Sequence, residues 1–209
     1  GVPVIPGSDG VVADREQAHE VAGKLGYPVM VKASAGGGGK GIRIVRTEDE
    51  LDQAFEAAQS ETKAAFGDDQ MYMEKVIEHA RHIEVQVLGD HFGNVIHLGE
   101  RDCSLQRKNQ KVLEEAPSPA LSEETREKMC KSAVLAAKAA GYESAGTIEF
   151  LYDHSGQYYF MEMNTRIQVE HPITEMITGV DIVKEQIRVA AGEKLSYEQS
   201  DIHITGHAI

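Results

Sequence analysis

Two cysteines, Cys103 and Cys130, are all that the 209 residues contain, so the sequence excludes a disulfide framework and predicts a reducing compartment. It also lacks any apolar run of membrane-spanning length and any recognisable signal peptide. We therefore predict a cytoplasmic protein that does not insert into a membrane.

Positive charge is scarce in this chain. Lys and Arg number 21 against 34 Asp and Glu, which gives a formal net charge of −13. This argues against nucleic acid or an anionic membrane as a partner, but not against a small anion in a local basic pocket. The apolar content of 41% is enough for a buried core. The first residues, "GVPVIPGS", and the last, "GHAI", predict a piece of a longer protein, truncated at both ends.

The pattern of residues 1–76 predicts a small α+β domain. Gly26 is suited to the C-cap of a first helix, and Thr47 with Glu50 predicts a capping box at the start of a second. The predicted helices are 13–26 and 47–66, and the predicted strands are 27–34, 42–46 and 70–77.

Residues 77–209 predict a second, larger domain. Two hairpins are expected, one turning at "DHFG" and one at "DHSG", and Ser122 is suited to the N-cap of a helix between them. The predicted strands are 82–90, 93–102, 146–152 and 157–164, and the predicted helices are 122–141 and 180–192.

Residues 33–41 read "ASAGGGGKG", and so many glycines in a folded domain need a reason. A Walker P-loop is excluded because Lys40 is followed by Gly41 rather than Ser or Thr. The pattern G-x-G-x-x-G is present, but a β-branched strand follows it where a dinucleotide fold needs a helix. A strand–loop–strand flap remains, whose backbone N–H groups would cradle phosphate. A merely flexible hairpin tip is the alternative, and Lys32, in an apolar strand just before the loop, favours phosphate.

Three oxygen-bearing side chains are expected on one face of the second hairpin. If the turn centres between residues 155 and 156, Glu149 pairs with Glu162, and Asn164 shares their face. Opposed like charges destabilise a sheet, and a Mg²⁺ ion would remove that penalty. The alternative is a solvated polar face. The other face would carry core residues, namely Ile148, Phe150, Met161 and Met163.

The run "NTRIQVEHP" places Arg166, Gln168 and Glu170 at alternate positions, in a stretch that we expect not to be helical up to Pro172. If this stretch is extended, the three side chains project to one side. An arginine and a glutamine are suited to a small oxyanion, and a glutamate beside them is suited to accept a proton. An exposed polar edge is an equally good interpretation of the spacing alone.

The chain resembles biotin carboxylase, an ATP-grasp enzyme, over its whole length. The motifs that carry the resemblance are "KASAGGGGKG", "MEKVIEHARHIEVQVLGD", "ERDCSLQRKNQKVLEEAPSP", "AGTIEFLY" and "FMEMNTRIQVEHPITEMITGVD". The run "EMNTRIQVEHPITE" separates biotin carboxylase from other ATP-grasp ligases. The chain is most similar to the biotin carboxylase subunit of bacterial acetyl-CoA carboxylase, which serves fatty acid biosynthesis, and pyruvate and propionyl-CoA carboxylases have closely similar parts.

The resemblance implies a fold and a set of ligands. It implies an α+β ATP-grasp fold, with a small lid over 1–76 and a larger antiparallel sheet with flanking helices over 77–209. ATP would lie between the flap and the larger sheet. The implied nucleotide-binding residues are Lys32, Gly38, Gly39, Glu74, Lys75, Val76, Ile77, His82 and Gln106, with Asn109 in a position where bacterial members often have histidine. Glu149, Glu162 and Asn164 would hold Mg²⁺ or Mn²⁺, in agreement with the hairpin argument.

The resemblance also implies the reaction. Lys111, Arg166, Gln168 and the Val169 N–H would bind bicarbonate, with Glu170 as its base, and bicarbonate would attack the γ-phosphate to give carboxyphosphate. That intermediate supplies CO₂ to biotin on a carrier protein, and a carboxyltransferase subunit uses the product. The family's N-terminal domain and later residues, which hold a phosphate-binding lysine, an arginine near biotin and most contacts of its homodimer, have no counterpart here. We therefore expect an incomplete biotin site and possible monomers. Another ATP-grasp ligase and a non-catalytic nucleotide-binding module are the alternatives.

Overall fold

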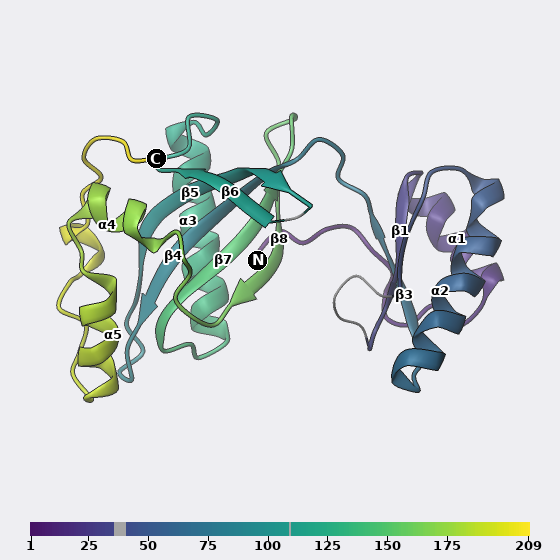
Figure 1. The fold of residues 1–209 in the computed structure, drawn as a ribbon, viewed down its shortest axis with the longest axis horizontal. Coiled ribbons are helices and arrows are strands. Elements are labelled where there is room, and N and C mark those ends of the chain that lie inside the picture. The colour runs from purple at the N-terminus through teal and green to yellow at the C-terminus, as the bar shows by residue number, and fades with distance from the viewer. Residues whose placement is uncertain (36–40, 109) are drawn as a thin grey trace. The chain divides into compact units, whose positions relative to one another are not determined.

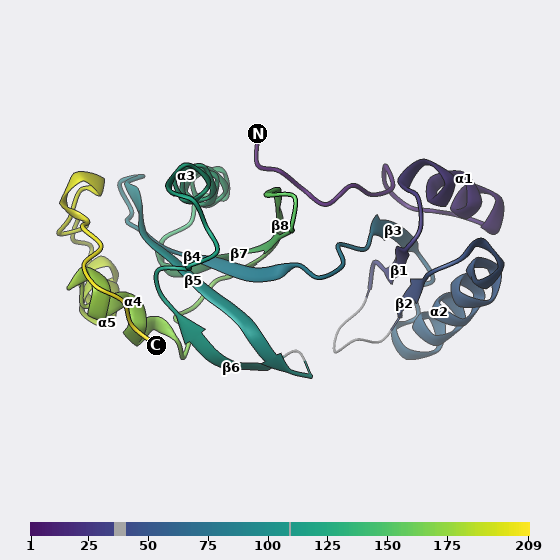
Figure 2. The ribbon, with the colours of Figure 1, turned by 90° about the horizontal axis from the view of Figure 1, so that it is seen from above.

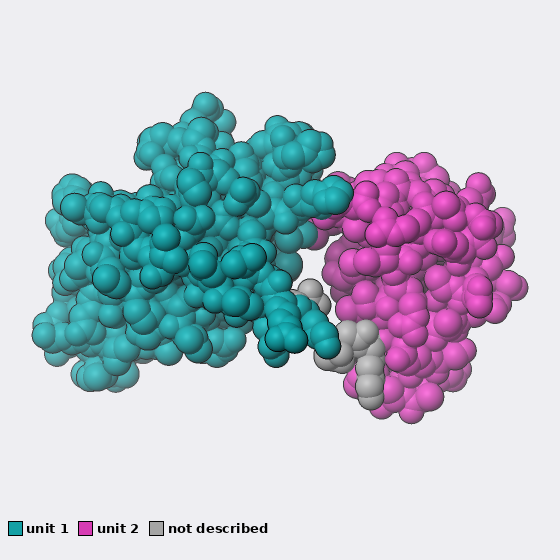
Figure 3. Space-filling view, turned by 45° about the horizontal axis from the view of Figure 1, so that its top comes forward, with its two compact units in different colours: residues 1–4, 79–209 teal, residues 5–78 magenta. Residues whose placement is uncertain are grey.

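The computed structural model describes residues 1–35, 41–108 and 110–209. The predictions for Gly38, Gly39 and Asn109 therefore lie outside the described residues, as does most of the glycine flap. The chain divides into two compact units, a smaller one, Ile5–Glu78, and a larger one that joins Gly1–Val4 to His79–Ile209 (Figures 1 and 3). The division falls two residues beyond the predicted boundary at 76/77, and the first four residues belong to the larger unit.

The smaller unit is a three-stranded antiparallel sheet with the strand order β2–β1–β3 and two helices packed against it. Its strands are β1 (Val29–Ala33), β2 (Ile42–Val45) and β3 (Met71–Lys75), and its helices are α1 (Arg15–Leu25) and α2 (Leu51–Phe66). Alternate residues of β1 and β3 point into a core shared with both helices, which includes Val29, Val31, Leu51, Phe55, Met71 and Met73.

The helix ends of the smaller unit confirm one expectation and correct another. Gly26 caps α1 with a φ of 71°, and its N–H donates to the Ala22 carbonyl. The predicted capping box at Thr47 is wrong, because Glu48–Glu50 form a 3₁₀ turn and the Thr47 side chain makes no capping bond. The Glu50 carboxylate instead accepts from the Arg46 N–H at 2.8 Å.

The larger unit is a five-stranded antiparallel sheet with the order β6–β5–β4–β7–β8. Its strands are β4 (Arg81–Gly89), β5 (Val95–Arg107), β6 (Gln110–Glu115), β7 (Ser144–Tyr152) and β8 (Tyr158–Asn164). Its helices are α3 (Glu123–Ala139), α4 (His171–Thr178) and α5 (Ile182–Ala190), with a 3₁₀ turn at Gln199–Asp201. Ser122 caps α3 as predicted, and its hydroxyl accepts from the Thr125 N–H. Strand β6 and helix α4 were not predicted from the sequence.

The two faces of this sheet differ in polarity. Helix α3 covers one face, where Ile83, Val85, Ile148 and Phe150 join its apolar side chains in the main core (Figure 2). On the opposite face α5 packs over one end, against a second cluster that includes Leu88 and Ile96. The alternation along β4 and β7 then brings polar residues to the remainder of this second face, where the candidate site lies.

A one-residue irregularity in β5 decides which of its polar residues reach that second face. The register with β4 shifts between Val85 and Val87, opposite Gly99, whose φ is 82°. Glu100 therefore faces α3, where it pairs with Arg126, while Arg101 turns to the opposite face. Among the described residues no helix is long and apolar enough to cross a membrane.

Candidate functional site

A cavity of about 750 Å³ opens on the polar face of the larger unit. Strands β4 to β8 and the segment after β8 supply its walls. The lining includes most of the residues that the sequence analysis selected in this unit: His82, Gln106, Lys111, Glu149, Glu162, Asn164, Arg166, Gln168, Val169 and Glu170. Side chains that are far apart along the chain therefore meet at one cavity.

Glu149 and Glu162 pair directly across β7 and β8, as predicted. The assumed turn geometry is wrong, however, because Phe150 pairs with Phe160 and a β-bulge follows between Phe150 and Glu149. The extra residue is Met161, which is 37% exposed and lines the cavity. The prediction that Met161 packs into the core is therefore wrong, and Phe160 takes that place against the main core.

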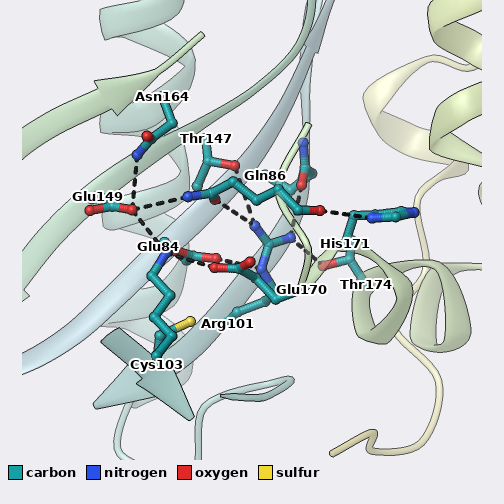
Figure 4. Close-up of polar contacts among 12 residues, drawn as sticks. Glu84, Gln86, Arg101, Cys103, Thr147, Glu149, Asn164, Glu170, His171 and Thr174 are labelled. Carbon is teal, nitrogen blue, oxygen red and sulfur yellow. Dashed lines mark hydrogen bonds and ion pairs between the residues drawn. The ribbon is translucent and has the colours of Figure 1, made fainter. Parts of the chain in front are cut away.

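Glu149 is the most heavily bonded carboxylate on the hairpin. Its Oε1 accepts from Asn164 Nδ2 and Lys111 Nζ at 2.9 Å each, and from Gln168 Nε2 at 3.2 Å (Figure 4). Its Oε2 lies 3.3 Å from His82 Nε2. Burial would raise the pKa of Glu149, but His82 and Lys111 outweigh it and hold the pKa at about 2. The carboxylate is therefore ionised at neutral pH.

Lys111 is surrounded by three carboxylates. Its Nζ pairs with Glu84, with Glu149 at 2.9 Å and with Glu170 at 2.7 Å. Burial would lower the pKa of this amine, but the three glutamates outweigh that effect and raise it. The ammonium is thus fixed as a cation at the wall of the cavity.

His82 lies at the same cluster and carries charge too. Burial would lower its pKa, but the nearby carboxylates of Glu149 and Glu84 raise it to about 9. Together, His82 and Lys111 balance part of the negative charge that Glu84, Glu149 and Glu170 bring to the cavity.

The segment after β8 is not an extended strand, and the expectation that it is non-helical up to Pro172 is wrong at His171. A turn forms where the His171 N–H donates to the Gln168 carbonyl, and α4 begins at His171 with Pro172 in its first turn. Gln168 and Glu170 are nevertheless buried at 5% and 9% exposure, while Val169 is 93% exposed. Arg166 is exposed, and its guanidinium donates to the Ile167 carbonyl. All four residues line the cavity.

The oxygen ligands on the hairpin fit a hard divalent cation. Glu162 is exposed beside the ionised Glu149, and Asn164 already lies within hydrogen-bonding distance of Glu149. Two carboxylates and an amide oxygen are the ligand types that Mg²⁺ prefers. The Asn164 amide would offer its oxygen after a rotation that exchanges its O and N positions.

The predicted nucleotide residues of the smaller unit lie on β1 and β3 or just after β3. Lys32 pairs with Glu74 at 2.6 Å, and its ammonium lies 5.7 Å from the centre of the Tyr72 ring. The Lys75 ammonium donates to the Gly26 and Tyr27 carbonyls, so its side chain anchors the backbone that follows α1. The N–H of Val76 donates to Pro28, and Ile77 is half-buried.

Two charged residues of this face, Glu84 and Arg101, were not predicted from the sequence. Glu84 was detectable, because "HIEVQV" alternates polar and apolar residues and places it with His82. Arg101 was not, because the Gly99 bulge interrupts the alternation of β5. Both side chains are fully buried, and they pair with each other at 2.6 Å.

Comparison with known proteins assigns the chain to a family. A family model described as "Carbamoyl-phosphate synthase L chain, ATP binding domain" matches residues 1–198. The chain belongs to this family. The biotin carboxylase of Nostoc sp. is 62% identical over 209 residues, which are all of this chain and 47% of that protein. The 2-oxoglutarate carboxylase small subunit of Hydrogenobacter thermophilus is 61% identical over all of this chain, which covers 44% of it.

Solved structures show the same relationship and confirm the predicted ATP-grasp fold. The biotin carboxylase of Campylobacter jejuni superposes with a TM-score of 0.90 at 56% identity, over 99% of this chain and 46% of that one. The biotin carboxylase domain dimer of Hydrogenobacter thermophilus 2-oxoglutarate carboxylase, solved with MgADP and bicarbonate, gives 0.89 at 61% identity, over the same two shares. The chain thus spans about half the length of the relatives that it matches.

Proposed function

We propose that this chain carries the ATP, metal and bicarbonate sites of a biotin carboxylase, a ligase that carboxylates biotin at the expense of ATP. The observation that supports this most strongly is the gathering of Lys111, Gln168 and Glu170 around Glu149 at one cavity. Its relatives include a biotin carboxylase and a domain solved with bicarbonate, at about 60% identity.

Bicarbonate is bound by donors of the cavity wall. Lys111 supplies a fixed positive charge, Arg166 supplies a guanidinium that is exposed to the cavity, and Gln168 supplies an amide N–H. The Val169 N–H is the fourth proposed donor. Charged donors of this kind bind a small oxyanion through strong hydrogen bonds, and a planar guanidinium matches a planar anion.

Glu170 acts as the base in this proposal. Its carboxylate removes the proton of bicarbonate as a bicarbonate oxygen attacks the γ-phosphorus, the bond to ADP breaks, and carboxyphosphate forms. Carboxyphosphate then yields CO₂ and phosphate. CO₂ bonds to a ring nitrogen of biotin, and the released phosphate takes the proton that this nitrogen loses. Lys111, 2.7 Å from Glu170, stabilises both the basic carboxylate and the charge on the transferring phosphoryl group.

Glu149, Glu162 and Asn164 hold Mg²⁺ or Mn²⁺, which when bound neutralises phosphate charge. The nucleotide is bound by Lys32 and Glu74 to Ile77 in the smaller unit, and by His82 and Gln106 in the larger one. Lys32, at present paired with Glu74, would exchange this partner for a phosphate group. Gly38, Gly39 and Asn109 complete the proposed set.

The biotin is proposed to be attached to a carrier protein, and a carboxyltransferase subunit to pass the carboxyl group to acetyl-CoA for fatty acid synthesis. Pyruvate and 2-oxoglutarate are the competing acceptors, since relatives named for them are 61% identical as well. Adding each acceptor with its carboxyltransferase and following labelled carbon from bicarbonate would identify the acceptor.

Release of ADP from MgATP tests the function itself. We expect the rate of ADP release to rise when bicarbonate is added, because bicarbonate is the acceptor of the γ-phosphoryl group. The rate should rise further with biotin, because biotin accepts the CO₂ from carboxyphosphate. Equal rates with and without bicarbonate, or stimulation by ammonia or another ATP-grasp substrate instead, would contradict a biotin carboxylase and favour a different ligase of the fold.

A further inference from the structure

Arg101 is the largest fully buried side chain of the described residues, and it donates to Gln168 in the cavity wall. Its guanidinium uses every N–H that it has. The five acceptors are Glu84 at 2.6 Å, Gln86 at 2.8 Å, Thr174 at 2.9 Å, and Thr147 and Gln168 at 3.3 Å each. Figure 4 shows the guanidinium between the residues of β4, β7 and α4.

Two of those acceptors affect the cavity wall: Gln168 is part of the wall, and Glu84 holds Lys111, which is also part of it. Gln168 accepts from Arg101 through its Oε1, so its amide nitrogen points to Glu149 and the cavity. Glu84 accepts from Arg101 through Oε1 and from Lys111 through Oε2. Arg101 thereby fixes the orientation of one proposed bicarbonate donor and, through Glu84, the position of another.

The balance of buried charges makes the position of Lys111 sensitive to the loss of Arg101. Glu84, Glu149 and Glu170 all pair with Lys111, and Arg101 shares only Glu84 with it. Without Arg101, the buried charge of Glu84 would depend on Lys111 and His82, and it would draw the Lys111 ammonium away from Glu170. The Gln168 amide would at the same time lose the partner that selects its donor face. Both changes weaken the binding of an anion in the cavity, and neither alters contacts of the smaller unit.

We propose that Arg101 is a positioning residue for bicarbonate, which sets the donor face of Gln168 and, through Glu84, the place of Lys111. This inference rests on the proposed function, because it takes Gln168 and Lys111 to be bicarbonate ligands. A lysine would not replace the arginine, since one ammonium cannot span five acceptors on several different elements.

The test is the kinetic effect of Arg101→Lys in the purified protein. We expect the KM for bicarbonate to rise by roughly 10- to 100-fold, because a small displacement of a binding group has effects of this size. The KM for MgATP is expected to stay unchanged. Arg126→Lys is the matched control. Arg126 also pairs with a buried glutamate, Glu100, which precedes Arg101 in the sequence and lies on the opposite face of the sheet. It should lower stability and leave both KM values as they are.

Equal effects of Arg101→Lys on both substrates, or the same effects as Arg126→Lys, would overturn the proposal by reducing Arg101 to a structural role. If Arg101→Lys does not fold, Glu84→Gln decides, because it keeps the shape of the side chain and removes the charge that links Arg101 to Lys111. An unchanged KM for bicarbonate would then overturn the proposal. If the unmodified protein shows no bicarbonate dependence, the proposed function has failed on its own. Crystal structures of Arg101→Lys and of the unmodified protein then decide. Displaced side chains of Lys111 and Gln168 in the variant would support the positioning role, and unmoved side chains would overturn it.

Discussion

Glu149 and Glu162 lie opposite each other on β7 and β8 because a bulge at Met161 shifts the register. Between the turn and Phe150 the strands pair symmetrically about Ser155, and beyond the bulge they pair one residue further along. Met161 then lines the cavity, and Glu162 and Asn164 follow on the strand beside Glu149. Bulges often re-aim side chains next to active sites, and this one supports the proposed metal ligands.

Glu162→Gln is expected to weaken the binding of Mg²⁺–nucleotide by roughly 10-fold or more, since it removes one charged ligand. The unfolding free energy without metal should stay the same or rise slightly, because the change also removes like-charge repulsion across the strands. Isothermal titration calorimetry with MgADP and thermal unfolding measure the two effects. Glu193→Gln, an exposed glutamate outside the cavity lining, is the control. Equal MgADP affinities of the two variants would mean that Glu162 is not a metal ligand.

Lys32→Gln is expected to weaken the binding of a non-hydrolysable MgATP analogue by about 10- to 100-fold, which corresponds to one charged hydrogen bond. The loss of stability should be about 1 kcal/mol or less, because the Lys32–Glu74 pair is partly exposed. Lys63→Gln breaks another ion pair of the same unit, with Asp69, and should leave affinity unchanged. A stability loss without an affinity loss in Lys32→Gln would assign Lys32 a structural role only.

Glu170→Gln is expected to lower bicarbonate-dependent ADP release by roughly 10²- to 10⁴-fold, the usual contribution of a general base. MgADP affinity should persist, because Glu170 is not a proposed ligand of nucleotide or metal. Glu115→Gln, on β6 and paired with His207 at 3.2 Å, is the control. Turnover that survives in Glu170→Gln would mean that another group takes the proton of bicarbonate.

The lowered pKa of His97 predicts how the unfolding free energy depends on pH. Burial lowers its pKa and Lys131 lowers it further, to about 4 from an ordinary 6.5, and its Nδ1 accepts from the Gly99 N–H at 3.3 Å. Between these two pH values the unfolded chain binds more protons than the folded one, so the unfolding free energy falls as the pH drops from 6.5 towards 4. His97→Gln should flatten this dependence from about pH 6.5 to about pH 5, where carboxylates contribute little. Denaturant unfolding measures it, with the exposed His203→Gln as control. An unchanged slope in His97→Gln would refute the assignment.

Periodicity predicted most of the elements because their alternation or helical spacing is unbroken. It placed Glu149 and Glu162 together, and the alternation in "HIEVQV" also contained Glu84. Helix α4 was missed because Pro172 was taken to exclude a helix before it, whereas proline is favoured in the first turn of one. Strand β6 was missed because it lies at the sheet edge, with Val112 and Leu113 exposed.

The two bulges mark the limit of sequence reasoning here. Each depends on packing across the sheet, and each moves a residue to the face opposite the one that counting predicts. Counting placed Met161 in the core and gave no sign of Arg101, whose partners come from β4, β7, α4 and the segment after β8. A residue whose role depends on several distant elements has no local signal in the sequence.

In the proposed reaction bicarbonate, rather than water, attacks the γ-phosphate. Transfer of oxygen from bicarbonate to phosphate tests it directly, because carboxyphosphate keeps one bicarbonate oxygen on phosphorus when it releases CO₂. With ¹⁸O-labelled bicarbonate, MgATP and short reaction times, mass spectrometry should find one labelled oxygen in each phosphate formed. Phosphate that carries oxygen only from the nucleotide and from unlabelled water would show hydrolysis without carboxyphosphate, and attack by bicarbonate would then be wrong.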